Sequence, residues 1–312
     1  MEQKLIRLKP TMKDYLWGGT KLRTEFGKES DLTKLAESWE LSVHKDGQSI
    51  IVDGTFAGKT LNEYIEAKGR EILGHNAMKF EKFPILIKLI DAADDLSVQV
   101  HPDDTYALAH EGEYGKTEMW YILSCDEGAS LYYGLNCEIS RQELAAKIAD
   151  NTLLEVLNKV AVHPGDVFFI PPGTIHAIGK GIVLCEIQQN SNTTYRVYDY
   201  DRRDKDGNPR ELHVEKAVDV ADLKPTKPTP KLENGILASC KYFTVEAKSC
   251  TESATILLSE DSFRAVNIVA GEAMLSLENE QLQVSKGDCI FVPAMNGEIA
   301  VNGRCELVIS YV

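Results

Sequence analysis

The chain has 312 residues, of which 43% are hydrophobic and 26% charged, the composition of a soluble globular protein long enough for two modest domains. Its net charge of −14 disfavours non-specific binding to nucleic acid and to anionic membranes. A small anionic substrate is still compatible with this charge, because a basic pocket can exist inside an acidic surface.

The N-terminus and the cysteines indicate a cytoplasmic protein. The first ten residues lack the apolar stretch of a secretory signal, and no apolar run approaches the roughly 20 residues needed to cross a bilayer. The seven cysteines are scattered without a CxxC pair, as expected for reduced thiols. The sequence predicts no protein partner, no nucleic acid and no membrane.

The predicted elements of the first half are mainly strands. Residues 1–60 contain short apolar runs between glycines and indicate irregular strands and turns. The apolar spacing of 61–73 predicts a helix, and the run 83–90, broken only by Lys88, predicts a strand buried on both faces. Further strands are expected at 96–101, 117–124, 130–133, 166–170, 182–188 and 194–200.

Helices are expected at only a few later positions. The interval 139–159 is predicted to be a small helical insertion of two short helices. Capping boxes would start these helices, at Ser140 with Glu143 and at Thr152 with Glu155. Another helix is expected at 211–222.

A proline-rich segment divides the chain. Prolines 225, 228 and 230 forbid a helix and favour an extended linker over residues 223–232. We expect residues 1–222 to form an N-terminal region and a first barrel. Residues 233–312, where short alternating strands return, are expected to form a second barrel.

An internal repeat predicts the fold class. Residues 165–171 and 287–293 both place a Gly-Asp turn before an apolar strand that ends at proline. This pattern is typical of small antiparallel barrels, so we expect a mostly β protein with two jelly-roll barrels and a few short helices. In the register of the repeat Glu298 replaces His176, and the second barrel is therefore predicted to be metal-free.

Four residues of the first barrel form a candidate metal site. Gln99 and His101 stand two apart on a predicted strand, so they project from one face. Glu118 lies on another strand, and His176 follows a Pro-Pro-Gly turn. Two imidazoles, a carboxylate and an amide oxygen can surround one cation and leave positions open to substrate. Spacing alone does not decide whether these four residues bind a metal. The other five histidines are interpreted as surface or hydrogen-bonded residues.

Basic residues interrupt the same strands. Lys88 is costly within a buried strand unless it is paired or faces a polar cavity, and the alternative is an edge-strand lysine whose stem points to solvent. Lys116 could simply pair with Glu118. If the strand near 194–200 continues, Arg196 and Arg202 share one face with Tyr198 and Tyr200, either as a solvated strand or as an anion clamp.

Several segments resemble type I mannose-6-phosphate isomerase, a zinc enzyme family of the cupin superfamily, in its short bacterial-type form. They are residues 83–91, 97–102, 116–120, 173–178 and 186–200, together with 17–22 and 36–39. The likeness runs in order from residue 10 to 220, whereas residues 233–312 match the family only in architecture. Longer members carry a larger helical domain where this chain has the insertion 139–159.

The resemblance implies a site and a reaction. It implies one Zn²⁺ per chain, held by Gln99, His101, Glu118 and His176. It implies catalytic roles for Arg196 and Lys116, and substrate-binding roles for Lys88, Glu37, Arg202 and Glu186. The expected reaction interconverts mannose 6-phosphate and fructose 6-phosphate through an enediolate that the metal and the basic residues stabilise. The resemblance does not decide which group is the general base; the candidates are Glu186, Glu37, Lys116 and a metal-bound hydroxide.

Two other functions fit parts of the pattern. Two histidines and one carboxylate also suit a non-haem iron oxygenase, but such an enzyme would not need Gln99 or the basic residues. A double barrel that only senses sugar phosphates would bind mannose 6-phosphate without forming ketose. The metal that co-purifies, oxygen consumption and ketose formation distinguish the three.

Overall fold

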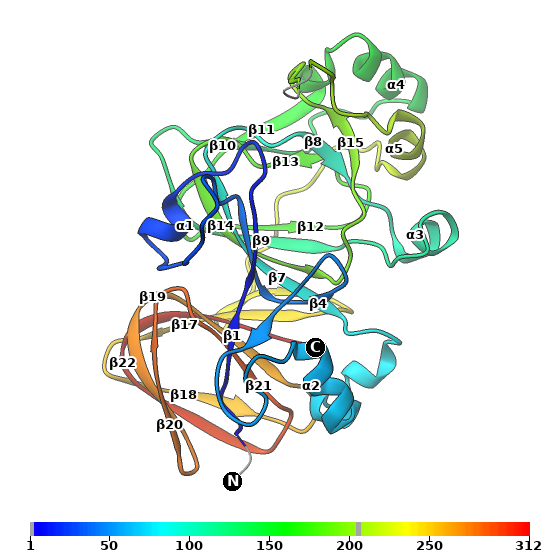
Figure 1. The fold of residues 1–312 in the computed structure, drawn as a ribbon. Helices are drawn as coiled ribbons and strands as arrows, with labels where there is room; N and C mark the ends of the chain where they lie inside the picture. The colour runs from blue at the N-terminus through cyan, green and yellow to red at the C-terminus, as the bar shows by residue number, and fades with distance from the viewer. Residues whose placement is uncertain (1–2, 204–206) are drawn as a thin grey trace.

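The computed structural model describes residues 3–203 and 207–312, and these residues are mostly β, as predicted. Their strands form three large antiparallel sheets and one short hairpin (Figure 1). None of the helices in this part of the chain has the length and hydropathy required to span a bilayer.

The three sheets have the following strand orders. The six-stranded sheet runs β12 (Val167–Ile170), β9 (Glu118–Cys125), β14 (Ile182–Gln189), β7 (Ile85–Ala92), β3 (Glu37–Leu41), β2 (Thr11–Lys13). The five-stranded sheet runs β11 (Leu157–Ala161), β10 (Ser130–Leu135), β13 (His176–Ala177), β8 (Val98–Val100), β15 (Tyr195–Tyr198). The nine-stranded sheet runs β16 (Ile236–Ser239), β17 (Thr244–Cys250), β22 (Gly297–Tyr311), β19 (Arg264–Leu277), β21 (Cys289–Val292), β1 (Ile6–Lys9), β6 (Ile50–Ile51), with β18 (Ser253–Leu258) on β22 and β20 (Glu280–Ser285) on β19.

The remaining elements are short. The hairpin consists of β4 (Val43–His44) and β5 (Gly47–Gln48). The α-helices are α1 (Lys21–Thr24), α2 (Leu61–Lys68), α3 (Asp104–His110), α4 (Arg141–Ala149) and α5 (Val214–Val220). The 3₁₀ segments are η1 (Arg70–Leu73), η2 (Ala77–Lys79) and η3 (Leu153–Val156).

Strand β7 lies between two hydrophobic cores, as its continuous apolar run predicts. Ile85, Ile87 and Leu89 pack into a core shared with the nine-stranded sheet, whereas Ile90 packs into the core between the five- and six-stranded sheets. Because β7 pairs with β14 on one side and β3 on the other, it is a central strand. The alternative of an edge-strand lysine at Lys88 is therefore wrong.

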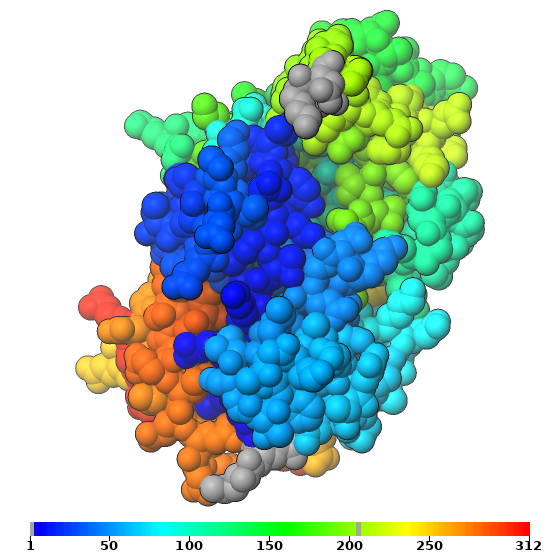
Figure 2. All heavy atoms as spheres, viewed as in Figure 1, coloured from blue at the N-terminus to red at the C-terminus, as the bar shows by residue number. Residues whose placement is uncertain are grey.

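The N-terminal strand crosses to the C-terminal sheet. β1 pairs with β21, and β6 pairs with β1, so the nine-stranded sheet takes strands from both sides of the linker 223–232 (Figure 1). Figure 2 shows these blue N-terminal residues bordering both the green and the orange parts of the chain. The linker contains neither a helix nor a strand; Pro225 forms a bridge with Leu135, and Thr226 N–H donates to Leu135 O. The division at 223–232 into two domains remains a prediction.

The internal repeat is also a repeat of local structure. Gly165 and Gly287 both adopt a positive φ, of 92° and 99°, which a residue without Cβ tolerates. In each copy the following aspartate accepts a hydrogen bond from a backbone N–H three residues before it, His163 N–H to Asp166 and Ser285 N–H to Asp288. The turns lead into β12 and β21 respectively. Glu298, which replaces His176 in the second copy, is exposed.

Three helix predictions need correction. The helix predicted at 61–73 ends at Lys68, because Gly69 has φ 89° and a 3₁₀ turn follows. The capping box at Ser140 is present, but Thr152 makes no side-chain cap. Thr152 N–H instead bonds to Lys147 O and completes a Schellman motif at the end of α4. The helix predicted at 211–222 is confined to α5, and α3 was not predicted from the sequence.

Candidate metal centre

Three buried side chains converge between the five- and six-stranded sheets. His101 follows β8, His176 begins β13, and Glu118 begins β9 on the facing sheet. One potential ligand atom from each lies within 4.8 Å of the others. Nε2 of His176 is 3.2 Å and Nε2 of His101 is 3.5 Å from the Glu118 carboxylate. No second group of this kind occurs within residues 3–203 and 207–312.

Backbone carbonyls fix the orientation of both imidazole rings. His101 Nδ1 donates to Thr193 O at 3.0 Å, and His176 Nδ1 donates to Thr174 O at 2.8 Å. A neutral imidazole that donates through Nδ1 presents a lone pair at Nε2, which is the arrangement of metal-binding histidines. Both Nε2 atoms face Glu118, so the two lone pairs and the carboxylate point into one space.

The charge states suit a cation. Burial and then the neighbouring Lys116 lower the pKa of His101 well below its ordinary value, so the ring is neutral at physiological pH. Burial alone would raise the pKa of Glu118, but the positive charge of Lys116, together with the contacts from the His101 and His176 imidazoles, outweighs burial and holds that pKa well below its usual range. Within the described residues, His101 Nε2 and Glu118 Oε1 are buried without a hydrogen-bond partner, and Glu118 Oε2 has only its ion pair with Lys116. Such orphaned acceptors are rare unless an ion or water satisfies them.

Gln99 lies beside this cluster. It is the cross-strand partner of His176, and its Nε2 is 3.3 Å from His176 Nε2. The oxygen and nitrogen of a glutamine amide are interchangeable in shape, so a flipped amide presents its oxygen at the same place. The residues present therefore fit a metal ion bound through two nitrogens and carboxylate oxygen, with an amide as a further ligand.

Lys116 is the cation in direct contact with the cluster. Its Nζ lies 3.1 Å from Glu118 Oε2, and the side chain is buried. The simple ion pair considered from the sequence is therefore present. A buried ammonium here also places positive charge next to any negative group that approaches the centre.

The polar residues of the six-stranded sheet form a row across neighbouring strands. Trp120, Glu186, Lys88 and Trp39 are successive cross-strand partners on β9, β14, β7 and β3. Glu186 accepts a hydrogen bond from Trp120 Nε1 at 2.9 Å and lies 3.0 Å from Lys88 Nζ. Glu37 accepts from Trp39 Nε1 at 2.6 Å and lies 3.6 Å from Lys88 Nζ. Two carboxylates thus already balance Lys88.

Arg196 extends the centre along the other sheet. It is the cross-strand partner of Gln99, which in turn pairs with His176, so the three side chains share one face. Arg196 donates to Ser97 Oγ and to Glu211 O. Among the described residues no carboxylate lies within ion-pair distance of Arg196, although it is half-buried. Its charge is therefore available to an anionic ligand.

Arg202 is placed differently from the prediction. β15 ends at Tyr198, and Tyr200 and Asp201 have φ values of 56° and 51°, so the chain turns and Arg202 does not share a strand face with Arg196. Arg202 Nη2 instead lies 2.7 Å from Asp199, which also accepts from Arg210 Nε at 2.7 Å. One carboxylate is therefore shared by two guanidinium groups, and Arg202 has a second partner in the exposed Asp94 at 3.9 Å.

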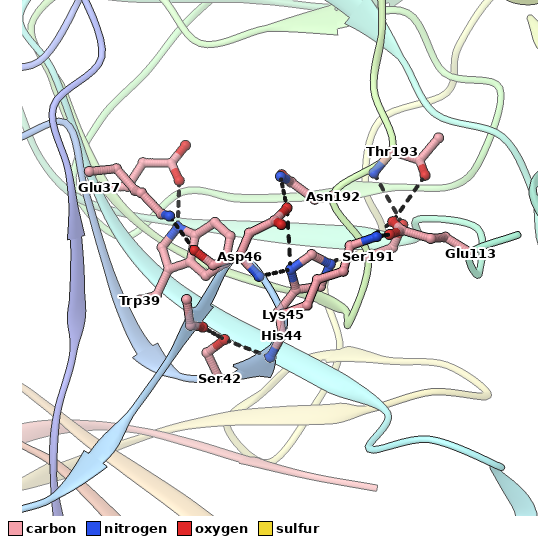
Figure 3. A network of polar contacts seen from close by, with 12 residues as sticks. Glu37, Trp39, Ser42, His44, Lys45, Asp46, Glu113, Ser191, Asn192 and Thr193 are labelled. Atoms are coloured by element: carbon pink, nitrogen blue, oxygen red, sulfur yellow. Dashed lines mark hydrogen bonds and ion pairs between the residues drawn. The ribbon is translucent and has the colours of Figure 1, made fainter. Parts of the chain in front are cut away.

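Other residues around the site were not identified from the sequence. Tyr15 is one, since burial and then the charge of Glu37 raise its pKa to about 12. Another group lies on the β4–β5 hairpin and two loops and comprises His44, Asp46, Glu113, Asn192 and Thr193 (Figure 3). Loop residues have no periodicity, and no pattern in the sequence indicates that these segments meet.

Comparisons with known proteins agree across the whole chain. The family model "Phosphomannose isomerase type I, catalytic domain" matches residues 5–122, and the model "Mannose-6-phosphate isomerase, cupin domain" matches residues 234–312. A mannose-6-phosphate isomerase of Streptococcus mutans is 40% identical over 311 residues, which cover 97% of each chain.

Solved structures extend the likeness to the fold. The crystal structure of the mannose 6-phosphate isomerase from Bacillus subtilis superposes with a TM-score of 0.90 at 37% identity, over 99% of this chain and 100% of that one. A phosphomannose isomerase variant from Salmonella typhimurium has a TM-score of 0.82 at 18% identity, over 99% of both chains. At that identity the second comparison shows a shared fold alone.

Proposed function

The chain belongs to the type I phosphomannose isomerase family, and from this premise we propose that it interconverts mannose 6-phosphate and fructose 6-phosphate at a centre for one divalent metal ion. The observation that carries the proposal is the convergence of His101, Glu118 and His176 in one buried space, where His101 Nε2 and Glu118 Oε1 lack hydrogen-bond partners within the described residues. A regulatory sugar-phosphate sensor would not require such a centre.

We propose Zn²⁺ as the ion, with Gln99 as the fourth ligand. Imidazole nitrogen and carboxylate oxygen are ordinary zinc ligands, and zinc imposes little geometric preference of its own. The rival of a non-haem iron oxygenase uses two histidines and one carboxylate without an amide. The position of Gln99 against His176 supports the four-ligand set over that rival.

The cationic side chains match the charge that this reaction develops. Isomerisation moves a proton between adjacent carbons and leaves negative charge on two neighbouring oxygens of the sugar. A bound metal supplies Lewis-acid stabilisation of such oxygens. Lys116, in contact with Glu118, and Arg196, on the same sheet face as Gln99 and His176, would add preorganised positive charge.

The substrate's phosphate needs a cation that is not fully neutralised. Lys88 faces two buried carboxylates, Glu186 and Glu37. Arg202 shares the carboxylate of Asp199 with Arg210, and its second partner, Asp94, is exposed and lies 3.9 Å away. We therefore assign phosphate binding to Arg202 rather than Lys88. Lys88 instead holds Glu186 and Glu37 in place beside the sugar site.

A coupled assay tests the function. The purified protein is treated with a chelator, and fructose 6-phosphate formation from mannose 6-phosphate is followed before treatment, after it and after Zn²⁺ is added back. We expect activity to be lost and then restored, with one metal ion per chain and no oxygen consumed. Saturable binding of mannose 6-phosphate by metal-loaded protein that forms no ketose would contradict the proposal and favour a sensor.

A further inference from the structure

The segment 190–193, between β14 and β15, passes directly beside the metal centre. Its Thr193 carbonyl accepts the hydrogen bond from His101 Nδ1 at 3.0 Å. Since this bond fixes the ring of His101, the position of the segment determines where His101 Nε2 points. Whatever holds residues 190–193 therefore also holds a candidate metal ligand.

Gln188 holds this segment from the inside. Gln188 is fully buried, and its Nε2 donates to Ser191 O at 2.6 Å and to Gln189 O at 2.8 Å. It is also the cross-strand partner of Glu118. The inner side of the segment is thus tied to the same strand pair that supplies the carboxylate of the centre.

Glu113 and Asp46 hold the segment from the outside. Glu113 accepts a hydrogen bond from Thr193 Oγ1 at 3.5 Å. Asn192 Nδ2 donates to Asp46 at 3.0 Å, which ties the segment to the β4–β5 hairpin (Figure 3). We call Glu113, Asp46 and Asn192 the outer latch.

Glu113 is the centre of the outer latch. Its carboxylate lies 2.5 Å from Lys45 Nζ and 3.9 Å from His44 Nε2, so it joins the hairpin, its own loop and the segment 190–193. Burial alone would raise the pKa of Glu113, but the hydrogen bond and charge of Lys45 together with the nearby His44 outweigh burial and keep the pKa below its usual value. A pocket of about 510 Å³ lies along Glu113, His44 and Asn190.

We propose that Glu113 is a positioning residue for the metal centre, which acts through the segment 190–193 and the Thr193 carbonyl on the orientation of His101. Glu113 need not touch the metal or the substrate for this. The inference rests on the proposed function only in taking His101 as a metal ligand. A purely structural Glu113 would change the stability of the protein without changing how the centre binds an ion.

The test measures metal binding apart from turnover. Co²⁺ is the probe, its affinity is measured by competition with a chromophoric chelator, and its visible absorption reports the ligand geometry. Mutation of a residue that hydrogen-bonds directly to a metal ligand lowers metal affinity 10–100-fold. Because Glu113 acts one contact further away, we expect Glu113→Ala to lower the Co²⁺ affinity roughly fivefold and to alter the Co²⁺ spectrum. Glu113→Gln should lie nearer to the wild type, because an amide oxygen can still accept the hydrogen bond from Thr193 Oγ1.

A matched control lies two residues away. Glu111 is as exposed as Glu113 and also ion-paired, but its partners are Lys216 and the Tyr195 hydroxyl. Glu111→Gln should keep wild-type Co²⁺ affinity and spectrum. Should Glu113→Ala not fold, Asp46→Ala opens the outer latch from the hairpin side and should change the spectrum in the same direction.

The outcomes separate the two proposals. Wild-type Co²⁺ affinity and spectrum in folded Glu113→Ala would overturn the positioning role and leave the isomerase proposal standing, as would an equal loss in Glu111→Gln. Failure of the wild-type protein itself to bind Co²⁺ would overturn the metal centre, and the positioning role with it.

Discussion

The ammonium of Lys88 lies 3.0 Å from the carboxylate of Glu186, and both groups are buried on adjacent central strands. Glu37 approaches the same ammonium at 3.6 Å. Burial alone would lower the pKa of Lys88, but Glu186 and then Glu37 outweigh it, so that pKa lies above its ordinary value. Lys88 is therefore charged at neutral pH.

Removing this charge should destabilise the fold. Lys88→Met leaves two buried carboxylates without their cation, and breaking a buried pair costs about 3–5 kcal/mol. Urea unfolding measures the loss, and the double variant Lys88→Met with Glu186→Gln should recover part of it. Lys59→Met removes an exposed pair with Glu63 and should change the free energy of unfolding little, because solvent screens such pairs. Equal stability of Lys88→Met and the wild type would refute the structural role of the pair.

Loss of a ligand should abolish metal-dependent stabilisation. Zn²⁺ at 100 times its dissociation constant stabilises a folded protein by about 2.7 kcal/mol, so it should raise the Tm of the chelator-treated wild type. His176→Ala and His101→Ala should show no rise in Tm, and neither should retain isomerase activity. His163→Ala, whose side chain is exposed, should respond like the wild type. A normal Tm rise in His176→Ala would exclude that residue as a ligand.

Arg196→Ala should separate turnover from metal binding. Its guanidinium has no carboxylate partner within the described residues, so its removal leaves no buried charge unpaired. We expect unchanged metal content and far-ultraviolet circular dichroism, with kcat lower by roughly 10²–10³-fold, as for other preorganised charge stabilisers. Arg141→Ala, at an exposed pair with Asp219, serves as the control. Normal turnover in Arg196→Ala would end its assigned role.

The metal-free protein should lose stability as the pH falls below 6.5. Burial lowers the pKa values of His44, His101 and His213 in the folded chain. Between each lowered value and 6.5 the unfolded chain binds a proton that the folded chain does not, so the free energy of unfolding decreases towards acid. Urea unfolding at pH 7.5 and 5.5 in the presence of chelator measures the decrease. His213→Gln should flatten the profile, and a rise in stability towards pH 5.5 would contradict the assignment.

Much of the local structure could be predicted from the sequence. The apolar run at 83–90, broken only by Lys88, indicated a strand buried on both faces, because apolar side chains point alternately to both sides of a strand. In the structure β7 lies between two hydrophobic cores. The Gly-Asp repeat indicated two equivalent turns, because a positive φ and a short acceptor side chain are local requirements. The spacing of Gln99 and His101 placed them on one face for the same kind of reason.

At other positions two local structures compete, and the local sequence pattern does not show which of them forms. Thr152 has the spacing of a capping box, but its backbone N–H is used to end α4. Arg202 has strand spacing from Arg196, but the turn at Tyr200 and Asp201 directs it to Asp199. In both places two local solutions were available, and packing of the surrounding chain selected one.

The sequence by itself determined which side chains could bind a cation and which segments had to be strands. Both depend on residue types and on the spacing of apolar residues within a few positions of the chain. Only the tertiary structure decided that Lys88 faces two carboxylates, that β1 joins the C-terminal sheet, and that residues 190–193 orient His101. These contacts join segments that are far apart in the chain. Their energies arise from burial and charge pairing in three dimensions, and no pattern along one strand or loop records them.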